Sequence, residues 1–448
     1  MSGQKESTGL MNLAESLASF GKTQGADEIE ITVVEGMEFD VDVRYGKIEN
    51  LIEAGSKYLA MRVIKEKRTA FATSSDLSMD TLQQLMKNAI RRTEYANLDE
   101  YTGLPNPSKS TFDQASLNIY DPEISELDPK KKIALAMETE KIALADRRIT
   151  NSHGASFETK EIKTHLVNSF GFIGEYKETV CSLSVGVQAG ETDEKVEDFW
   201  SSSQRYFKDL EPPEKIAQRA VERTVRQIRP RKIQTQNVSV IFEPPMTSWL
   251  LGFLFSCVSG MAVYQKLSFL ADKLGEKIGN DNITVYDDGH MPGKLGTRPF
   301  DSEGVPTSQN TVIQKGMLKN FLCDTYAARK LKLQSTGNAD GAGVGPNNFY
   351  LQAGEFSPEE IIKSTAKGLI LTRTLGHGLN PVTGDISRGA FGLWVVKGEI
   401  AYPVSEITIA GNLGKILNQI EMVGNDLEFR SPISGPTIKI QQLTIAGE

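Results

Sequence analysis

Alternating polar and apolar residues, framed by two helical stretches, constrain the fold of the first hundred residues more than any other feature. Apolar residues recur at helical spacing in residues 9–22 and again in residues 82–90. Turn residues, notably Tyr45-Gly46 and Ala54-Gly55, separate the strand-like segments between them. These segments cover residues 30–34, 39–44, 47–52, 58–64 and 69–72. The pattern predicts an α+β sandwich with a mixed or antiparallel sheet and one covered face.

The composition changes to Pro, Ser, Asn and Thr between residues 101 and 120, which is typical of a linker. A helix is predicted over residues 128–148, followed by alternating strands from 150 to 189 with a turn at Gly171. Pro212-Pro213 opens a further helix, which Pro230 ends. We therefore expect an N-terminal α/β domain, a middle α+β segment and a C-terminal domain, with the boundaries 1–110, 111–232 and 233–448.

Strand and turn signals dominate the last part of the chain. A short apolar strand is predicted at residues 238–242, and residues 437–445 alternate again. Ser357-Pro358-Glu359-Glu360 is a capping box that predicts a helix start. Lys315-Gly316 and Lys397-Gly398 each lie between alternating runs and predict hairpins. The C-terminal domain is therefore expected to be rich in strands.

The charge balance argues against direct nucleic-acid binding. The net charge is -8, and the basic residues cluster only on the helix after Pro213, at Arg219, Arg223 and Arg226. Glu222 interrupts this cluster and no aromatic platform accompanies it, so we interpret it as a solvated helix face. The acidic stretch at residues 191–198 is likewise interpreted as a solvated loop.

The cellular setting is interpreted as cytoplasmic. Cys181, Cys257 and Cys323 are far apart, form no C-x-x-C motif and cannot all pair. The polar N-terminus lacks the apolar region of a secretory signal. The longest nearly apolar stretch, residues 249–258, has about half the length needed to cross a bilayer and is interpreted as a core segment. No membrane association is expected.

Few residues are candidates for metal binding or nucleophilic catalysis. The four histidines are His153, His165, His290 and His377, and no two are three or four residues apart, so no helix presents a His pair to a metal. A site assembled from His290, His377 and a nearby aspartate remains the alternative. Ser259, Ser405 and Cys257 lack a recognisable base and are interpreted as structural. The glycine-rich residues 335–346 lack the Lys-Ser/Thr of a P-loop, which favours a flexible loop near the working surface.

Four motifs carry a resemblance to a known family. They are the Asp-Asp-Gly at residues 287–289, the Arg-Pro-Phe-Asp-Ser-Glu-Gly run that begins at residue 298, and the segments 376–390 and 402–413. Together they resemble the TldD/PmbA family, the so-called modulators of DNA gyrase, and specifically its PmbA (TldE) branch. The resemblance covers nearly the whole chain and is strongest from residue 287 to residue 413.

The resemblance implies an α+β fold with a strand-rich C-terminal domain and a role beside a zinc peptidase. Catalytic relatives carry an H-E-x-x-x-H helix before the Asp-Asp-Gly segment and a cysteine ligand after a Val-Gly-Asn-Asp segment. Here residues 257–266 contain no histidine or glutamate, and residues 427–434 contain no cysteine. The resemblance therefore implies a non-catalytic subunit without a cofactor of its own, with zinc in a TldD-like homologous partner and an unfolded peptide as substrate.

Channel or partner contacts are expected at five residues, on the basis of the resemblance. Two alternatives are kept: an interaction protein that modulates DNA gyrase, and a stand-alone metallopeptidase with a rearranged site. For the chain alone the oligomeric state is left open, with a homodimer as one alternative. The five residues are Tyr264, His377, Asp385, Arg388 and Glu406.

Overall fold

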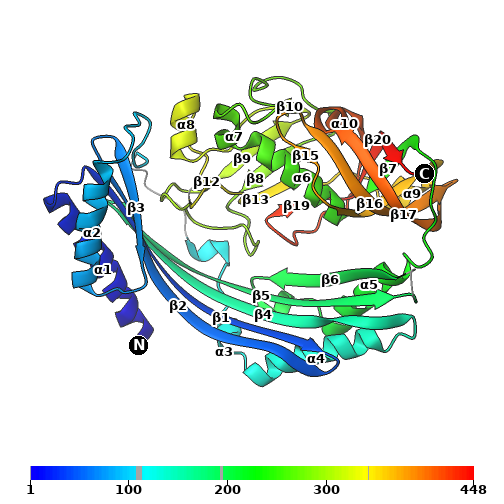
Figure 1. Cartoon of the computed structure of the whole chain (residues 1–448), viewed down its shortest axis with the longest axis horizontal. Coiled ribbons are helices and arrows are strands. Elements are labelled where there is room, and N and C mark those ends of the chain that lie inside the picture. The colour runs from blue at the N-terminus through cyan, green and yellow to red at the C-terminus, as the bar shows by residue number, and fades with distance from the viewer. Residues whose placement is uncertain (1, 107–113, 192–194, 342) are drawn as a thin grey trace.

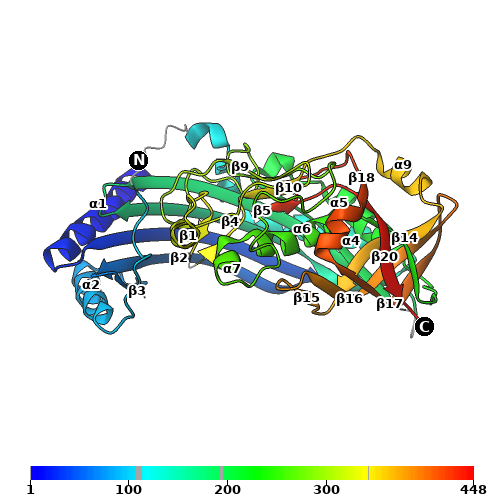
Figure 2. The same ribbon diagram turned by 90° about the horizontal axis from the view of Figure 1, so that it is seen from above.

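The computed structural model describes residues 2–106, 114–191, 195–341 and 343–448. A long curved sheet forms one side of the molecule, and a C-terminal domain lies against its concave face (Figure 1). The view from above shows the C-terminal domain extending along the strands (Figure 2). This arrangement confirms the predicted α+β class, with a strand-rich C-terminal domain.

Six antiparallel strands form the curved sheet in the order β3-β2-β1-β4-β5-β6. Their bounds are β1 (Glu28–Arg44), β2 (Lys47–Lys65), β3 (Arg68–Ser74), β4 (Ile149–Asn168), β5 (Ile173–Ala189) and β6 (Val196–Gln204). The Tyr45-Gly46 turn is confirmed, and both of its residues have positive φ. The turn expected at Ala54-Gly55 is wrong, because these residues lie within β2. Gly55 faces Met37 and Gly36 faces Ser56 in an unbroken register, so the ladder continues through both glycines.

Two separate cores lie on the same face of this sheet. Along β1, alternate residues point to one side. Ile29, Ile31 and Val33 pack with α1 (Ser2–Thr23) and α2 (Met79–Thr93). Further along the strand, Phe39, Val41 and Val43 pack with the second helix group. That group contains α3 (Pro122–Glu126), α4 (Pro129–Leu144) and α5 (Pro213–Val225). The helices cover the convex face, which leaves the other face to the C-terminal domain (Figure 1).

The sheet continues across the boundary expected near residue 110, because β1 pairs with β4 over Glu30–Val43. The expected linker at residues 101–120 lies partly outside the described residues, and η1 (Gln114–Leu117) is the helical turn that follows. The predicted helix after residue 128 is α4, and the turn at Gly171 joins β4 to β5 as expected.

The C-terminal domain contains a closed barrel and a second sheet. In the barrel the order is β14-β7-β20-β17-β16, and additional pairing between β14 and β16 closes it. The second sheet has the order β10-β9-β8-β13-β19. The bounds are β7 (Gln236–Phe242), β14 (Lys367–Leu375), β15 (Leu379–Asn380), β16 (Asp385–Val396), β17 (Glu399–Asn412), β18 (Ile420–Val423), β20 (Ile438–Ala446), β8 (Val285–Asp288), β9 (Gln309–Gln314), β10 (Met317–Leu318), β13 (Asn348–Leu351) and β19 (Ile433–Ser434).

Helices fill the space between these sheets and cap their ends. They are α6 (Pro244–Val258), α7 (Gly260–Tyr264), α8 (Thr325–Leu331), α9 (Pro358–Lys363) and α10 (Leu413–Gln419). The apolar run that ends at Val258 is the buried part of α6, as predicted. The capping box at Ser357 and Glu360 is confirmed, and so are the hairpin turns at Lys315-Gly316 and Lys397-Gly398.

The glycine-rich residues 335–346 form a short ladder, β11 (Ala339–Asp340) with β12 (Gly343–Val344). Asn338 is fully buried there and donates to the Asp287 carboxylate (2.8 Å). The expectation of a flexible loop is therefore wrong for the described residues of this segment, because buried hydrogen bonds attach it to β8.

The interpretation of a solvated basic helix face is also wrong. Arg223 pairs with Asp198 (3.1 Å), and Arg226 pairs with Glu243 at the start of α6 (2.6 Å). Asp198 belongs to β6 and is only 5% exposed, so it does not lie in a solvated loop. Glu197 also belongs to β6, Glu191 and Lys195 are exposed, and residues 192–194 lie outside the described residues. These charges face one another because α5 packs against β6 and against the C-terminal domain.

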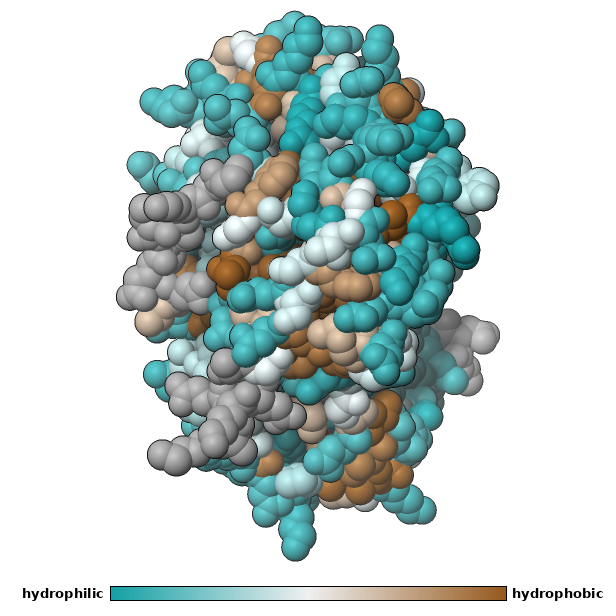
Figure 3. All heavy atoms as spheres, turned by 90° about the vertical axis from the view of Figure 1, so that its left-hand side faces the viewer, coloured by the Kyte–Doolittle hydropathy of each residue, from teal (hydrophilic) through white to brown (hydrophobic). Residues whose placement is uncertain are grey.

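Figure 3 shows the end of the molecule that carries α1 and α2. Most of this surface is hydrophilic, and its apolar side chains form separate groups. Within the described parts of the chain, no helix combines the length and the apolar composition needed to span a bilayer.

Candidate functional site

The segment that would hold a zinc helix in catalytic relatives is the end of α6 together with α7. Leu250, Leu254 and Val258 bury this part of α6 in the core. Cys257 is also buried, and burial raises the pKa of its thiol to about 12. Because zinc binds the thiolate form of cysteine, a buried thiol that keeps its proton is a poor ligand. The residues of this segment therefore do not fit a zinc ion.

The alternative zinc site around His290 and His377 is not formed either. His290 follows β8, and its backbone N–H donates to the Asp288 carboxylate (2.8 Å). His377 is exposed on the loop between β14 and β15. Across the described ranges, no three His, Cys, Asp or Glu side chains are grouped as metal ligands.

Asp385 and Arg388 lie at the start of β16. The Asp385 carboxylate accepts a hydrogen bond from Asn412 Nδ2 (2.9 Å), which lowers the pKa of Asp385. Asp385 and Asn412 line a polar hollow of about 350 Å³ beside α10. The Arg388 guanidinium lies 5.3 Å from the centroid of the Trp249 ring on α6. Strand β16 thus carries one residue of an open hollow and one that contacts α6.

Glu406 and Tyr264 occupy different surroundings. Glu406 has a φ of 55°, at a point where the β16–β17 register shifts, and it pairs with Lys232 (3.0 Å). Both partners of this pair are exposed, so the pair contributes little to stability. The Tyr264 ring, at the end of α7, packs edge-on against Tyr326 of α8 with 5.8 Å between centroids.

The five expected contact residues do not converge on one site. None of the hydrogen bonds, ion pairs and ring contacts between described residues joins any two of them. Their role in contacting a partner or a channel stays a prediction.

Sequence reasoning missed a cluster that joins the two parts of the molecule near Tyr264. Lys330 Nζ lies 4.2 Å from the Tyr101 ring centroid and 3.6 Å from the Asp99 carboxylate. Tyr326 donates its hydroxyl hydrogen to Asp99 (2.5 Å), and this contact together with burial raises the pKa of Tyr326. The local signal, an N-cap at Asp324, identifies α8 but not its distant partners.

A second junction was also missed, at the concave face. Arg62 on β2 pairs with Glu30 on β1 (3.1 Å) and with Glu303 of the C-terminal domain (3.0 Å). Burial raises the pKa of Glu30 to about 7, against the opposing effect of Arg62. Asp301 is buried nearby, and burial raises its pKa to about 7 as well. Glu303 of the motif therefore holds the C-terminal domain on the sheet, whereas Asp301 accepts hydrogen bonds from within the C-terminal domain.

The Asp-Asp-Gly motif has a structural explanation of the same kind. Asp287 is fully buried and accepts hydrogen bonds from Asn338 Nδ2 (2.8 Å), Asn347 N (2.9 Å) and Asn347 Nδ2 (3.0 Å). Burial raises the pKa of Asp287 to about 6, and these hydrogen bonds oppose that rise. Through these hydrogen bonds from within the protein, the Asp287 carboxylate anchors the glycine-rich segment.

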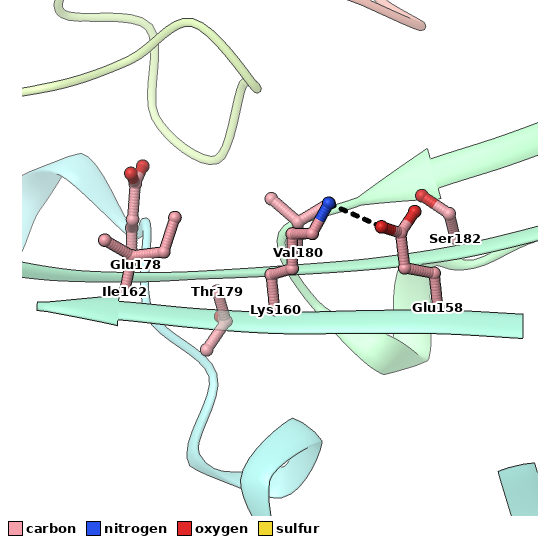
Figure 4. Close-up of a pocket in the computed structure, with 7 residues that line it drawn as sticks. All are labelled: Glu158, Lys160, Ile162, Glu178, Thr179, Val180 and Ser182. Carbon is pink, nitrogen blue, oxygen red and sulfur yellow. Dashed lines mark ion pairs between the residues drawn. The ribbon is translucent and has the colours of Figure 1, made fainter. Parts of the chain in front are cut away.

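The concave face contains a small pocket of about 140 Å³. Figure 4 shows Glu158, Lys160 and Glu178 on β4 and β5 pointing toward the C-terminal domain, whereas Thr179 points the other way. Lys160 pairs with Glu158 (2.5 Å), and Glu178 pairs with Arg205 (2.6 Å). Directly opposite Glu158 in the ladder is Asp40 of β1. The concave face of the curved sheet, which faces the C-terminal domain, is thus lined by charged side chains.

Fold and sequence together define the class of this protein. Family models described as PmbA/TldA metallopeptidase domain 1, central domain and C-terminal domain match residues 29–92, 122–228 and 235–447. The chain therefore belongs to the PmbA/TldD metallopeptidase family.

Individual relatives are similar to this chain along nearly its whole length. The chain is 37% identical to "Metalloprotease PmbA" of Escherichia coli O157:H7, over 98% of this chain and 95% of the relative. Among solved structures, it is similar to a putative modulator of DNA gyrase from Bacteroides thetaiotaomicron, with a TM-score of 0.91, 29% identity and 98% coverage of both chains. It is also similar to TldE from Thermococcus kodakarensis, with a TM-score of 0.88, 25% identity and coverage of 97% and 100%.

Proposed function

We propose that this chain is the non-catalytic subunit of a zinc peptidase complex that acts on unfolded peptides. The observation that carries the proposal is the segment 257–266, where the only zinc-binding side chain is the buried, protonated thiol of Cys257. Zinc and the general base would belong to a homologous subunit that carries the H-E-x-x-x-H helix. The likeness to a protein called TldE supports this assignment.

We further propose that the partner is a TldD-like homologue and that the complex is located in the cytoplasm. Cys181, Cys257 and Cys323 are buried and unpaired, which suits a reducing compartment. The metalloprotease names of the relatives fit an activity that belongs to the assembled complex.

The test is chelator-sensitive cleavage of a fluorescence-quenched, unstructured peptide by this chain, by the homologue, and by a co-expressed mixture. We expect cleavage by the mixture, none by this chain alone, and zinc only in preparations that contain the homologue. Replacing the glutamate of the homologue's H-E-x-x-x-H helix by Gln should abolish the activity of the mixture.

Zinc-dependent cleavage by the single chain would refute the proposal. In that case His290→Ala and His377→Ala are the variants that test the rearranged site. Modulation of DNA gyrase is the second candidate, because similar solved structures carry that description. It predicts that the chain alters gyrase supercoiling activity without any zinc subunit.

A further inference from the structure

The outer edge of β2 is a free strand edge. β3 pairs with β2 only from Leu59 to Lys65, and no other strand of the described residues pairs with the outer edge between Lys47 and Tyr58. The register with β1 shifts between Asp42 and Val43, which leaves Glu49 as an extra residue. The regular part of the free edge is therefore Asn50–Tyr58, the segment that we call the β2 edge. Free backbone N–H and C=O groups on such an edge are a template for another strand.

The side chains of the β2 edge suit an added strand. Leu51, Ile52 and Tyr58 are 46%, 40% and 43% exposed, although apolar residues of this size are usually covered. Between them lie the small residues Ala54, Gly55 and Ser56, which leave the backbone accessible, and the charged residues Glu53 and Lys57. Proteins usually protect long edges with charges or prolines. This edge has two charged residues and no proline, and Ile52 and Tyr58 place exposed apolar side chains on one of its faces, which indicates an interaction surface.

Acidic residues lie immediately behind the β2 edge. Glu38, Asp40 and Asp42 of β1 face Ala54, Ile52 and Asn50 across the ladder, on the concave face of the sheet. Among the described residues none of these three carboxylates forms a direct ion pair, although Lys160, opposite Glu38 in the β1–β4 ladder, interacts electrostatically with Glu38 and Asp40. Burial, and then the neighbouring Asp42 and Glu158, raise the pKa of Asp40, as expected for crowded negative charges. A strand added outside β2 would lie about 10 Å from β1, so a lysine side chain that extends over Ala54 would approach Glu38.

The ends of the β2 edge decide which kind of strand can bind. Beyond Leu59 the same edge is occupied by β3, and before Asn50 the extra residue Glu49 interrupts the regular ladder. A second copy of this chain would offer a β2 strand of 19 residues within a sheet, and its continuation would meet β3. A single extended segment of about seven to nine residues avoids this overlap.

We propose that the β2 edge binds an extended, basic segment of the peptide substrate by strand addition. The inference rests on the proposed function for the identification of the ligand as substrate. Backbone hydrogen bonds supply affinity in this mode of recognition, and the side chains that alternate along the segment supply selectivity. Lysine or arginine on the concave side would pair with Glu38 and Asp40.

The probe is a fluorescein-labelled nonapeptide of alternating Thr and Lys, titrated into the purified full chain at low ionic strength. Two related peptides complete the set: one with Gln in place of Lys, and one N-methylated at every backbone nitrogen. We expect the Lys peptide to bind, the Gln peptide to bind about three- to tenfold more weakly, and the methylated peptide not to bind. Hydrogen exchange should show slower exchange of backbone amides in Asn50–Tyr58 when the Lys peptide is bound.

The charge contribution is isolated by Glu38→Gln combined with Asp40→Asn. This variant should bind the Lys peptide about three- to tenfold more weakly and leave the Gln peptide unchanged. The matched control, Asp272→Asn with Glu355→Gln, removes the same charge at exposed positions elsewhere and should bind as the unaltered chain does.

Three results would overturn the inference: equal binding of the methylated peptide, protection of amides outside the β2 edge, or equal weakening by the control variant. Sedimentation of a dimer whose β2 amides are protected without peptide would assign the edge to a second copy instead. Because the assay needs no zinc subunit, its failure is distinguishable from failure of the cleavage assay that tests the proposed function.

Discussion

Some residues of the family motifs are needed for the conformation of the backbone, and Gly378 is an example. Gly378 has a φ of 147°, and a Cβ atom there would overlap the backbone oxygen of Ser387. The Ser387 N–H in turn donates to the Gly378 carbonyl (2.8 Å). The glycine therefore allows the segment around β15 to approach β16 closely enough to form this contact.

Replacing Gly378 by alanine should destabilise the fold by about 1–3 kcal/mol, because the new methyl group meets backbone that cannot move away cheaply. The measurement is chemical unfolding monitored by tryptophan fluorescence. Gly9→Ala is the control, because a Cβ at this exposed helical position meets nothing within 4 Å. It should leave stability unchanged or slightly raised. Equal losses in both variants would contradict the explanation.

Glu30 lies at the junction between the curved sheet and the C-terminal domain. We expect it to make the free energy of unfolding depend on pH. Burial raises its pKa from 4.5 to about 7 in the folded protein. Between these values the folded chain holds a proton that the unfolded chain has lost, so stability falls as pH rises from about 4.5 to 7. Glu30→Gln should flatten this dependence by up to about 1.4 kcal/mol per pH unit.

The dependence on Glu30 is measured by urea unfolding at several pH values between 4.5 and 7.5. Asp272→Asn, at an exposed site, provides the control and should keep the original slope. An unchanged slope in Glu30→Gln would show that the proton is bound elsewhere in the junction, for example at Asp301.

At the scale of elements, α5 is one of the parts that join the curved sheet to the C-terminal domain. Trp200 of β6 lies against the guanidinium groups of Arg219 (4.6 Å), Arg223 (5.3 Å) and Arg430 (4.2 Å), measured to a ring centroid. Because Arg430 belongs to the C-terminal domain and Arg223 to α5, this cluster connects β6 and α5 with a segment of the C-terminal domain that is distant in sequence.

Arg223→Ala should destabilise the chain by about 3–5 kcal/mol, since it leaves the buried Asp198 carboxylate without its ion-pair partner. Thermal and urea unfolding measure the loss. Arg148→Ala removes an exposed arginine paired with Asp146 at 2.6 Å and should have no measurable effect. A small effect in Arg223→Ala would mean that water or Gln227, which also contacts Asp198 (3.0 Å), replaces the arginine.

The sequence predicted elements well where the signal is local. The capping box at Ser357 and the hairpin turn at Lys397 depend on residues within a few positions of each other, and both are confirmed. Gly55 was misread as part of a turn because only the pairing with β1 shows that it continues a strand.

Contacts between distant segments could not be predicted. Asp198 and Arg223 looked like separate solvated charges, and Asp99 gave no sign of its bond to Tyr326, which is 227 positions away. For the candidate site, the sequence identified the motifs, but it did not reveal that Asp287 and Glu303 serve internal contacts. The contact of Glu303 with Arg62 depends on the packing of the C-terminal domain against the curved sheet, and the contacts of Asp287 depend on the fold of the C-terminal domain itself.

At the scale of the whole molecule, the curved sheet is one structural unit made from two stretches of chain. Strands β1 to β3 come from the first hundred residues and β4 to β6 from residues 149–204, and the β1–β4 ladder joins them. The fragment 1–110 therefore keeps β2 but lacks β4, the second strand partner of β1, and the helices that cover Phe39, Val41 and Val43.

We expect the fragment 1–110 to be unfolded or aggregated and the fragment 1–232 to be folded, because only the longer fragment contains all six strands and both cores. Circular dichroism and the dispersion of amide signals in NMR spectra measure the difference. A folded, monomeric 1–110 fragment would show that the first core suffices and would support the boundary expected from the sequence.

The β1–β4 pairing also has a consequence for synthesis on the ribosome. When β1 to β3 have emerged, α1 and α2 can already cover Ile29 and Val33, whereas Phe39 and Val41 stay uncovered until α4 and β4 follow. More than a hundred residues separate the end of β1 from the end of β4, which at about 5–20 residues per second takes several seconds or longer. During that time the nascent chain presents an open, apolar strand surface. We therefore expect the N-terminal third of this protein to be a client of ribosome-associated chaperones while it is being translated.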